Sequence, residues 1–140
     1  MPNSALTAIE INESAAVALD AIPDCTPVIK SILDYEVENQ FEFVFTSGVL
    51  IHINPEHLLQ VYQLMAAASS RFVMMAEYYN PTPMTIPYRG HDDRLFKRDF
   101  AGEFMDANSD FELVDCGFDY HRAVFPADDT TWFLMERRSS

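Results

Sequence analysis

Strand-length apolar runs alternate with helical patterns along most of this chain of 140 residues. Such alternation is typical of βαβ units, in which helices connect parallel strands. Strands are expected over residues 6–11, 28–33, 41–46 and 72–77. Helices are expected over residues 13–22, 55–68 and 99–107. The sequence therefore predicts an α/β fold with a mostly parallel sheet.

The C-terminal part has a different pattern. Residues 111–120 and 132–137 are both predicted strands with no helix between them, so we expect an antiparallel hairpin there. The chain shows no internal repeat, linker or low-complexity segment, and 49% of it is apolar. A single domain over residues 1–140 is therefore expected.

A formal net charge of −13 argues against attraction to nucleic acid or to an anionic membrane. No apolar run reaches the about 20 residues of a membrane span, and the first residues lack the features of a signal peptide. Cys25 and Cys116 have no paired spacing, and the four histidines form no ligand set, so no metal is expected. These observations predict a soluble, cytoplasmic protein.

An acid, Glu10, lies near the end of the predicted strand over residues 6–11, and a helix follows. In nucleotide-binding α/β domains, such an acid after the second strand holds the ribose hydroxyls. A glycine-rich turn after the first strand approaches the charged end of the cofactor. No such turn precedes Glu10, so we expect a truncated Rossmann-like fold whose first strand is missing. The alternative for Glu10 is a solvated charge before a helix N-terminus.

The missing strand would lie between the strands ending at Glu10 and at Thr46, which leaves a gap of roughly 10 Å. Either these two strands pair directly, or a second copy of the chain fills the gap, or the N-terminal segment is only partly ordered. Unpaired strand edges favour association. We therefore expect a homo-oligomer, or an N-terminal segment supplied by another chain.

A basic cluster follows the strand over residues 72–77. Four of the nine Lys and Arg residues fall within ten positions, namely Arg89, Arg94, Lys97 and Arg98. In so acidic a chain this favours a local anion site for a carboxylate or a phosphate. The alternative is that neighbouring acids neutralise the cluster in surface ion pairs, the candidates being Asp92, Asp93 and Asp99.

Four segments form a motif set: residues 45–55 (FTSGVLIHINP), 76–83 (AEYYNPTP), 86–91 (IPYRGH) and 95–102 (LFKRDFAG). This set resembles the pseudaminic acid biosynthesis-associated methylases, a family of class I S-adenosylmethionine-dependent methyltransferases. The resemblance implies methyl transfer in a pathway of nonulosonic acid sugars, with a nonulosonic sugar or nucleotide-sugar as partner. Family members carry a further N-terminal region with the glycine-rich turn, so we expect this chain to be inactive alone.

Candidate site residues follow from the order of elements and from the resemblance. Expected cofactor contacts are Glu10, Asp34, Tyr35, Ser47, Gly48 and Leu50. Expected substrate contacts are Tyr78, Tyr79, Asn80, Tyr88, Arg89, His91, Lys97 and Arg98. His52 is a candidate base, and a packing or capping role is its alternative. A different interpretation of the whole chain is a non-catalytic sugar-binding or assembly module on a degenerate methyltransferase fold.

Overall fold

The computed structural model describes residues 4–124 and 128–139 and divides into two compact units. The first unit is Met1–Glu36 and the second is Val37–Ser140. No helix in the described part of the chain is long and apolar enough to cross a membrane. The single domain expected over residues 1–140 stays a prediction.

The first unit is a small βαβ arrangement. Strand β1 (Leu6–Glu10) pairs in parallel with β2 (Cys25–Ile29), and helix α1 (Glu13–Leu19) connects them. The helix begins where predicted because the Asn12 side chain accepts a hydrogen bond from the N–H of Ser14 at 2.9 Å. A short 3-10 helix, η1 (Ile32–Asp34), follows β2.

The second strand of this unit lies earlier in the chain than predicted. A strand was expected over residues 28–33, but β2 already begins at Cys25 and includes Pro27. Pro27 lies opposite Ala8 in a sheet of only two strands. A proline lacks an N–H to donate, which a strand at the edge of a sheet tolerates.

The second unit contains a mixed four-stranded sheet, in the order β3-β4-β8-β7. Its strands are β3 (Phe41–Ser47), β4 (Ser69–Glu77), β7 (Phe111–Asp119) and β8 (Thr130–Arg137). Strands β3 and β4 are parallel, whereas β8 runs antiparallel to both of its neighbours. The predicted C-terminal hairpin is therefore confirmed, but the prediction of a mostly parallel sheet is not.

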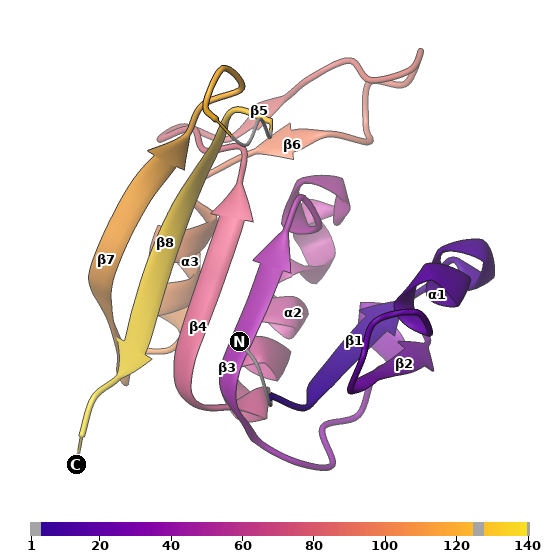
Figure 1. Cartoon of the computed structure of the whole chain (residues 1–140). Helices are drawn as coiled ribbons and strands as arrows, with labels where there is room; N and C mark the ends of the chain where they lie inside the picture. Colours follow the sequence, from indigo (N-terminus) through magenta and orange to yellow (C-terminus); the bar gives the residue numbers. More distant parts are fainter. Residues whose placement is uncertain (1–3, 125–127, 140) are drawn as a thin grey trace. The chain divides into compact units, whose positions relative to one another are not determined.

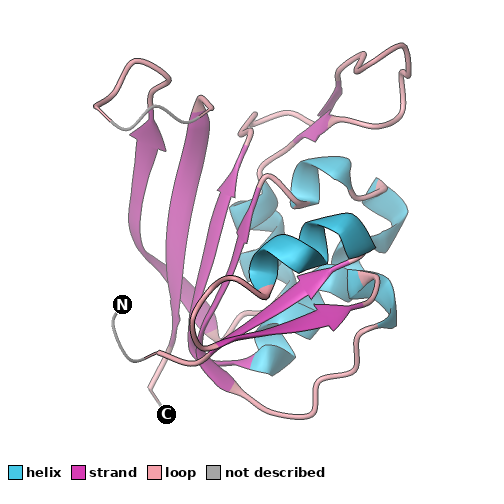
Figure 2. Ribbon diagram, turned by 45° about the vertical axis from the view of Figure 1, so that its right-hand side comes forward, coloured by secondary structure: helices cyan, strands magenta, loops and turns pink. Residues whose placement is uncertain are grey.

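Two helices cover one face of this sheet (Figures 1 and 2). The N-cap of α2 (Pro55–Ala68) is Asn54, which accepts from the N–H of Glu56 at 3.1 Å. The N-cap of α3 (Phe100–Ala107) is Asp99, which accepts from the N–H of Gly102 at 2.9 Å. The core beneath them consists of fully buried side chains, among them Val61, Met65, Val73, Phe104, Phe111 and Met135.

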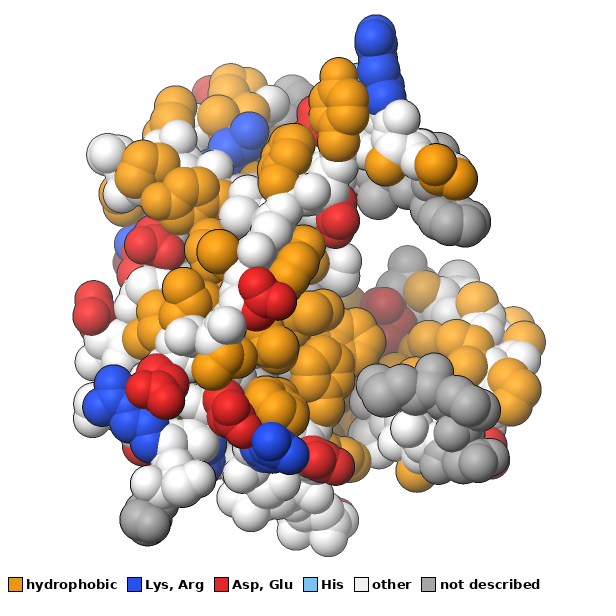
Figure 3. All heavy atoms as spheres, turned by 60° about the vertical axis from the view of Figure 1, so that its left-hand side comes forward, with side chains coloured by type: hydrophobic (Ala, Val, Ile, Leu, Met, Phe, Trp, Pro, Cys, Tyr) orange, Lys and Arg blue, Asp and Glu red, His pale blue; other side chains and the backbone are white. Residues whose placement is uncertain are grey.

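The opposite face of the four-stranded sheet carries half-exposed hydrophobic side chains. These side chains lie on β3, β4 and β8 and alternate along each strand: Phe43, Phe45, Phe72, Met74, Trp132 and Leu134. Hydrophobic side chains also remain visible over much of the surface in the space-filling view (Figure 3). Trp132 lies directly over Gly117, where a Cβ atom would come within 2.5 Å of the indole ring. A glycine is therefore required opposite this tryptophan.

Strands β1 and β3 each lie at an end of their sheet in the part of the chain that the structure describes. Among the described residues, β1 pairs with β2 alone and β3 pairs with β4 alone. These two strands belong to different units, so direct pairing of the strands ending at Glu10 and Thr46 stays a prediction. Filling of the gap by a second copy, and partial order of the N-terminal segment, stay predictions.

A long loop follows β4 and lies beyond the carboxyl ends of β3 and β4 (Figure 1). It contains two short antiparallel strands, β5 (Met84–Thr85) and β6 (Phe96–Lys97). A 3-10 helix after β3, η2 (Leu50–His52), contacts β6. The loop is thus attached to the segment that leaves the central parallel pair.

A buried carboxylate holds η2 in place. Glu77, the last residue of β4, is 3% exposed. Its Oε1 atom accepts from the backbone N–H groups of Val49 and Leu50 at 3.1 and 3.2 Å, and Oε2 accepts from that of Ile51 at 3.4 Å. Burial raises the pKa of Glu77, and these hydrogen bonds oppose the increase. One side chain therefore satisfies three N–H groups that the loop would otherwise leave without partners.

Replacing Glu77 with glutamine removes the titrating group and keeps one acceptor oxygen. Because the pKa of Glu77 in the folded protein is raised above 4.5, the folded state binds this proton more tightly than the unfolded state does. The resulting stabilisation is complete below that value and is lost as the pH rises through the raised pKa. In this window the free energy of unfolding of the wild type should fall by up to about 1.4 kcal/mol per pH unit relative to Glu77→Gln.

Urea denaturation of both proteins across the pH range measures this difference. Glu38→Gln, which neutralises an exposed carboxylate of the same unit, controls for the change in net charge. A difference between wild type and Glu77→Gln that does not vary with pH would contradict the prediction.

Candidate anion-binding site

Five side chains line a hollow of about 410 Å³ in the second unit: His52, Tyr88, Arg89, His91 and Arg94. His52 comes from η2, after β3, and the other four come from the loop after β4. All five carry hydrogen-bond donors, and none of the described residues that line the hollow is acidic. Such a lining attracts anions.

A tight turn carries two of these side chains. Tyr88 and His91 exchange two backbone hydrogen bonds of 2.7 and 3.0 Å, which close a four-residue turn. The two central residues, Arg89 and Gly90, have φ angles of 49° and 81°. Two successive left-handed residues are typical of hairpin turns, and glycine adopts this conformation readily, whereas arginine adopts it at a cost. The turn thus fixes the positions from which Arg89 and His91 reach the hollow.

The ring of His52 has a defined orientation. Its Nδ1 atom lies 2.8 Å from the carbonyl oxygen of Arg94. Because a carbonyl oxygen only accepts, Nδ1 carries the hydrogen, and the Nε2 atom of a neutral ring is then an acceptor. The ring centroid lies 5.6 Å from that of Tyr88. His52 is therefore attached to the loop on which the arginines lie, and its second nitrogen is available to a ligand.

The arginines of the hollow have no acidic partner in the described part of the chain. Within the described residues neither Arg89 nor Arg94 forms an ion pair, and the Arg89 guanidinium lies 5.1 Å from the centre of the Tyr88 ring. Asp99 caps α3 instead of pairing with a base. Neutralisation of the cluster by neighbouring acids is therefore not observed at Arg89 and Arg94.

Arg98, in contrast, is neutralised. Its Nη2 atom lies 2.8 Å from Oε1 of Glu103, and Oε2 of Glu103 accepts a hydrogen bond of 2.9 Å from the Tyr62 hydroxyl. Burial, followed by the charge of Glu103, raises the pKa of Tyr62, so the phenol remains a donor. Arg98 therefore stabilises the contact between α2 and α3.

The remaining predicted substrate contacts lie outside the lining of the hollow. The Tyr78 hydroxyl donates to Oδ2 of Asp128 at 3.0 Å, and Lys97 Nζ lies 5.3 Å from the centre of the Tyr78 ring. Desolvation, and then the bond to Asp128, raises the pKa of Tyr78. Tyr79 packs against Phe133 with ring centroids 5.6 Å apart. Asn80 donates to the carbonyl oxygen of Thr82.

Three predicted cofactor contacts belong to the first unit. Glu10 ends β1, and its Oε1 atom accepts from the N–H of Asn12 at 2.7 Å. Asp34 is the last residue of η1 and is exposed, and Tyr35 follows it and is half-buried. The contact of Glu10 with the start of α1 agrees with the alternative of a charge before a helix, and it leaves Oε2 without a described partner.

The other three predicted cofactor contacts belong to the second unit. Ser47 is exposed at the end of β3, and Gly48 follows with a φ angle of 63° and donates its N–H to Ala76 at 3.0 Å. Leu50 has a fully buried side chain, and its N–H is bonded to Glu77. Ser47 and Gly48 thus remain accessible to a ligand, whereas the side chain of Leu50 has no exposed surface.

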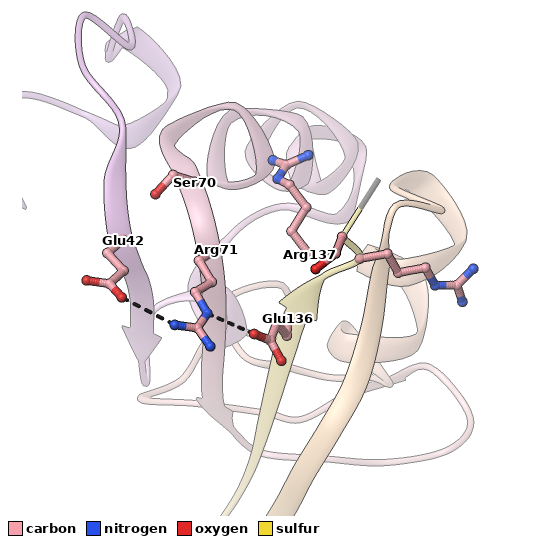
Figure 4. Close-up of a pocket in the computed structure, with 7 residues that line it drawn as sticks. Glu42, Ser70, Arg71, Glu136 and Arg137 are labelled. Carbon is pink, nitrogen blue, oxygen red and sulfur yellow. Dashed lines mark hydrogen bonds and ion pairs between the residues drawn. The ribbon is translucent and has the colours of Figure 1, made fainter.

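A second hollow, of about 660 Å³, lies at the other end of the sheet (Figure 4). Arg71 lies between Glu42 at 3.6 Å and Glu136 at 2.8 Å. Arg137 donates to the carbonyl oxygens of Ala66 and Ser69 at 2.7 and 3.0 Å. Because these guanidinium groups already have acceptors, this hollow is an ion-pair network and not a site for an anion.

Two residues that shape the candidate site were not among the predicted contacts. Arg94 was counted in the basic cluster but not among the substrate contacts, and Glu77 lies in one of the four motif segments but was assigned no role. An acid that ends an otherwise apolar strand is a signal that could have identified Glu77.

Comparison with known proteins identifies the fold. No protein-family model matches the sequence, and no curated protein matches it. Solved structures do match. Burkholderia thailandensis 1,6-didemethyltoxoflavin-N1-methyltransferase, crystallised with 1,6-didemethyltoxoflavin and S-adenosylhomocysteine, has a TM-score of 0.74 at 12% identity. The match covers 96% of this chain and 62% of that one.

Two further structures agree with this result. The N-methyltransferase NodS of Bradyrhizobium japonicum, in complex with S-adenosylhomocysteine, has a TM-score of 0.70 at 10% identity, over 96% of this chain and 67% of that one. A methyltransferase from Methanosarcina mazei has a TM-score of 0.66 at 9% identity, over 96% and 82%. The chain therefore has the α/β fold of the class I S-adenosylmethionine-dependent methyltransferases.

Proposed function

We propose that this chain forms the acceptor-binding part of an S-adenosylmethionine-dependent methyltransferase, and that the acceptor is an acidic sugar of the nonulosonic class, such as pseudaminic acid. The observation that carries the proposal is the cation-lined hollow formed by His52, Tyr88, Arg89, His91 and Arg94. Its residues belong to the segments that follow the parallel strands β3 and β4, and open α/β sheets bind ligands at the carboxyl ends of such strands. The methyltransferase fold and the sequence motifs around the hollow support it further.

The side chains have complementary roles in this proposal. Arg89 and Arg94 hold the anionic group, and the face of the Tyr88 ring packs against the sugar. The Nε2 atom of His52 accepts a hydrogen bond, or the proton, from an acceptor hydroxyl. S-adenosylmethionine supplies the methyl group when bound, with Glu10 as the proposed ligand of its ribose hydroxyls and Ser47 and Gly48 as further contacts.

One observation favours the non-catalytic alternative, a sugar-binding or assembly module. The hollow is formed entirely by residues of the second unit, whereas the proposed cofactor contacts come from both units. Anion binding therefore does not require a complete cofactor site. Inactivity of the isolated chain, a cytoplasmic location and a homo-oligomer stay predictions beside either function.

Calorimetric titration with CMP-N-acetylneuraminate, a nucleotide-linked nonulosonic acid, tests the sugar proposal. We expect saturable binding that weakens at least about tenfold in Arg94→Ala, because a charge-assisted hydrogen bond contributes about 1.5–3 kcal/mol. Arg138→Ala is the matched control, because this exposed arginine pairs with Glu112 outside the anion hollow. Absence of saturable binding, or an equal loss in the control, would contradict the proposal.

Titration with S-adenosylhomocysteine separates the enzyme from the binding module. We expect saturable binding that is lost in Glu10→Ala, since the carboxylate is the proposed acceptor for the ribose hydroxyls. Glu13→Ala, which removes a neighbouring exposed carboxylate, is the control. If millimolar ligand gives no heat, the enzyme proposal fails for this chain, and the binding module remains.

A further inference from the structure

We infer that the anion hollow binds a terminal phosphoryl group in preference to a carboxylate, so that the ligand is a phosphate monoester. The inference rests on the proposed function of the same site and narrows the chemical class of its substrate. It depends on the number and arrangement of the donors, on the local charge and on the geometry of the turn.

The donors outnumber the acceptor atoms of a carboxylate. Four donor side chains, those of Tyr88, Arg89, His91 and Arg94, line one hollow of about 410 Å³, whereas the N–H of His52 is bonded to the carbonyl oxygen of Arg94. A carboxylate has two oxygens in one plane, and a single guanidinium fork satisfies both. A terminal phosphoryl group has three oxygens in a tetrahedral arrangement and accepts bonds from several directions. The lining therefore matches the phosphoryl group better.

The local charge also matches a dianion. Arg89 and Arg94 bring two permanent positive charges without an acid in the lining or an ion pair among the described residues. A phosphate monoester carries about −1.5 to −2 charges near pH 7, whereas a carboxylate carries −1. Asp92 and Asp93 follow His91 directly, but both are exposed, and within the described residues neither forms an ion pair with these arginines.

The turn presents its donors in a fixed arrangement before any ligand binds. Arg89 adopts a left-handed conformation that is unfavourable for a residue with a side chain, and such conformations are concentrated at functional sites. Gly90, with a φ angle of 81°, permits the turn, and a Cβ atom added there would meet no atom within 4 Å. A substitution at Gly90 therefore changes the backbone geometry without a steric clash.

Three probes test the inference on the full chain: inorganic phosphate, N-acetylneuraminate and CMP-N-acetylneuraminate. Titration is followed by the backbone amide NMR signals of Gly90 and His91. We expect phosphate to bind at least about tenfold more tightly than N-acetylneuraminate and to displace CMP-N-acetylneuraminate. Arg94→Ala should weaken phosphate binding at least about tenfold, and Gly90→Ala should weaken it several-fold although every cation is retained. Arg138→Ala should have no effect.

The outcomes separate this inference from the proposed function. If N-acetylneuraminate binds as tightly as phosphate, the phosphoryl inference is overturned while the sugar proposal stands. If phosphate binds at these amides and the nucleotide sugar does not, the inference stands and the sugar proposal fails. If no probe shifts these signals, both are overturned. Unchanged thermal unfolding of Arg94→Ala and Gly90→Ala shows that a loss of binding is not a loss of fold.

Discussion

The candidate site depends on the carboxylate of Glu77. This side chain ends β4 and accepts three hydrogen bonds from successive N–H groups of the segment that leaves β3, so it fixes one parallel strand to the exit of the other. The cost is a charge held out of water, which the raised pKa reflects. His52 gains a defined position from this contact, because η2 cannot move without leaving buried N–H groups unbonded.

The candidate site also depends on which basic side chains are not paired with an acid. Arg98, Lys97 and Arg94 are close in sequence but have different partners: Arg98 pairs with Glu103, Lys97 lies over Tyr78, and Arg94 faces the hollow. Glu103 in turn receives a hydrogen bond from Tyr62 on α2. The packing of α2 against α3 therefore neutralises one base of the cluster, and the candidate anion site contains fewer bases than the run of basic residues.

Local patterns were sufficient to predict part of this structure. The Asn54-Pro55 start of α2 and the C-terminal hairpin follow from caps and alternation within a few residues, and both are confirmed. The bounds expected for the second strand, residues 28–33, were wrong because β2 is Cys25–Ile29 and contains Pro27, a residue type that local patterns place in turns. A basic cluster indicated an anion site, but the contact between His52 and Arg94 joins residues 42 positions apart. No local pattern encodes a contact of that range, so the composition of the hollow required the structure.

The proposed anion binding and the proposed cofactor binding require different parts of the chain. Every residue that lines the anion hollow belongs to the second unit, whose core is closed by α2 and α3. The proposed cofactor contacts come from both units, with Glu10 in the first and Gly48 in the second. The proposed anion binding therefore requires only the folding of residues 37–140, whereas the proposed cofactor binding requires residues of both units. A chain that retains the first activity and lacks the second would be a binding module on a methyltransferase fold.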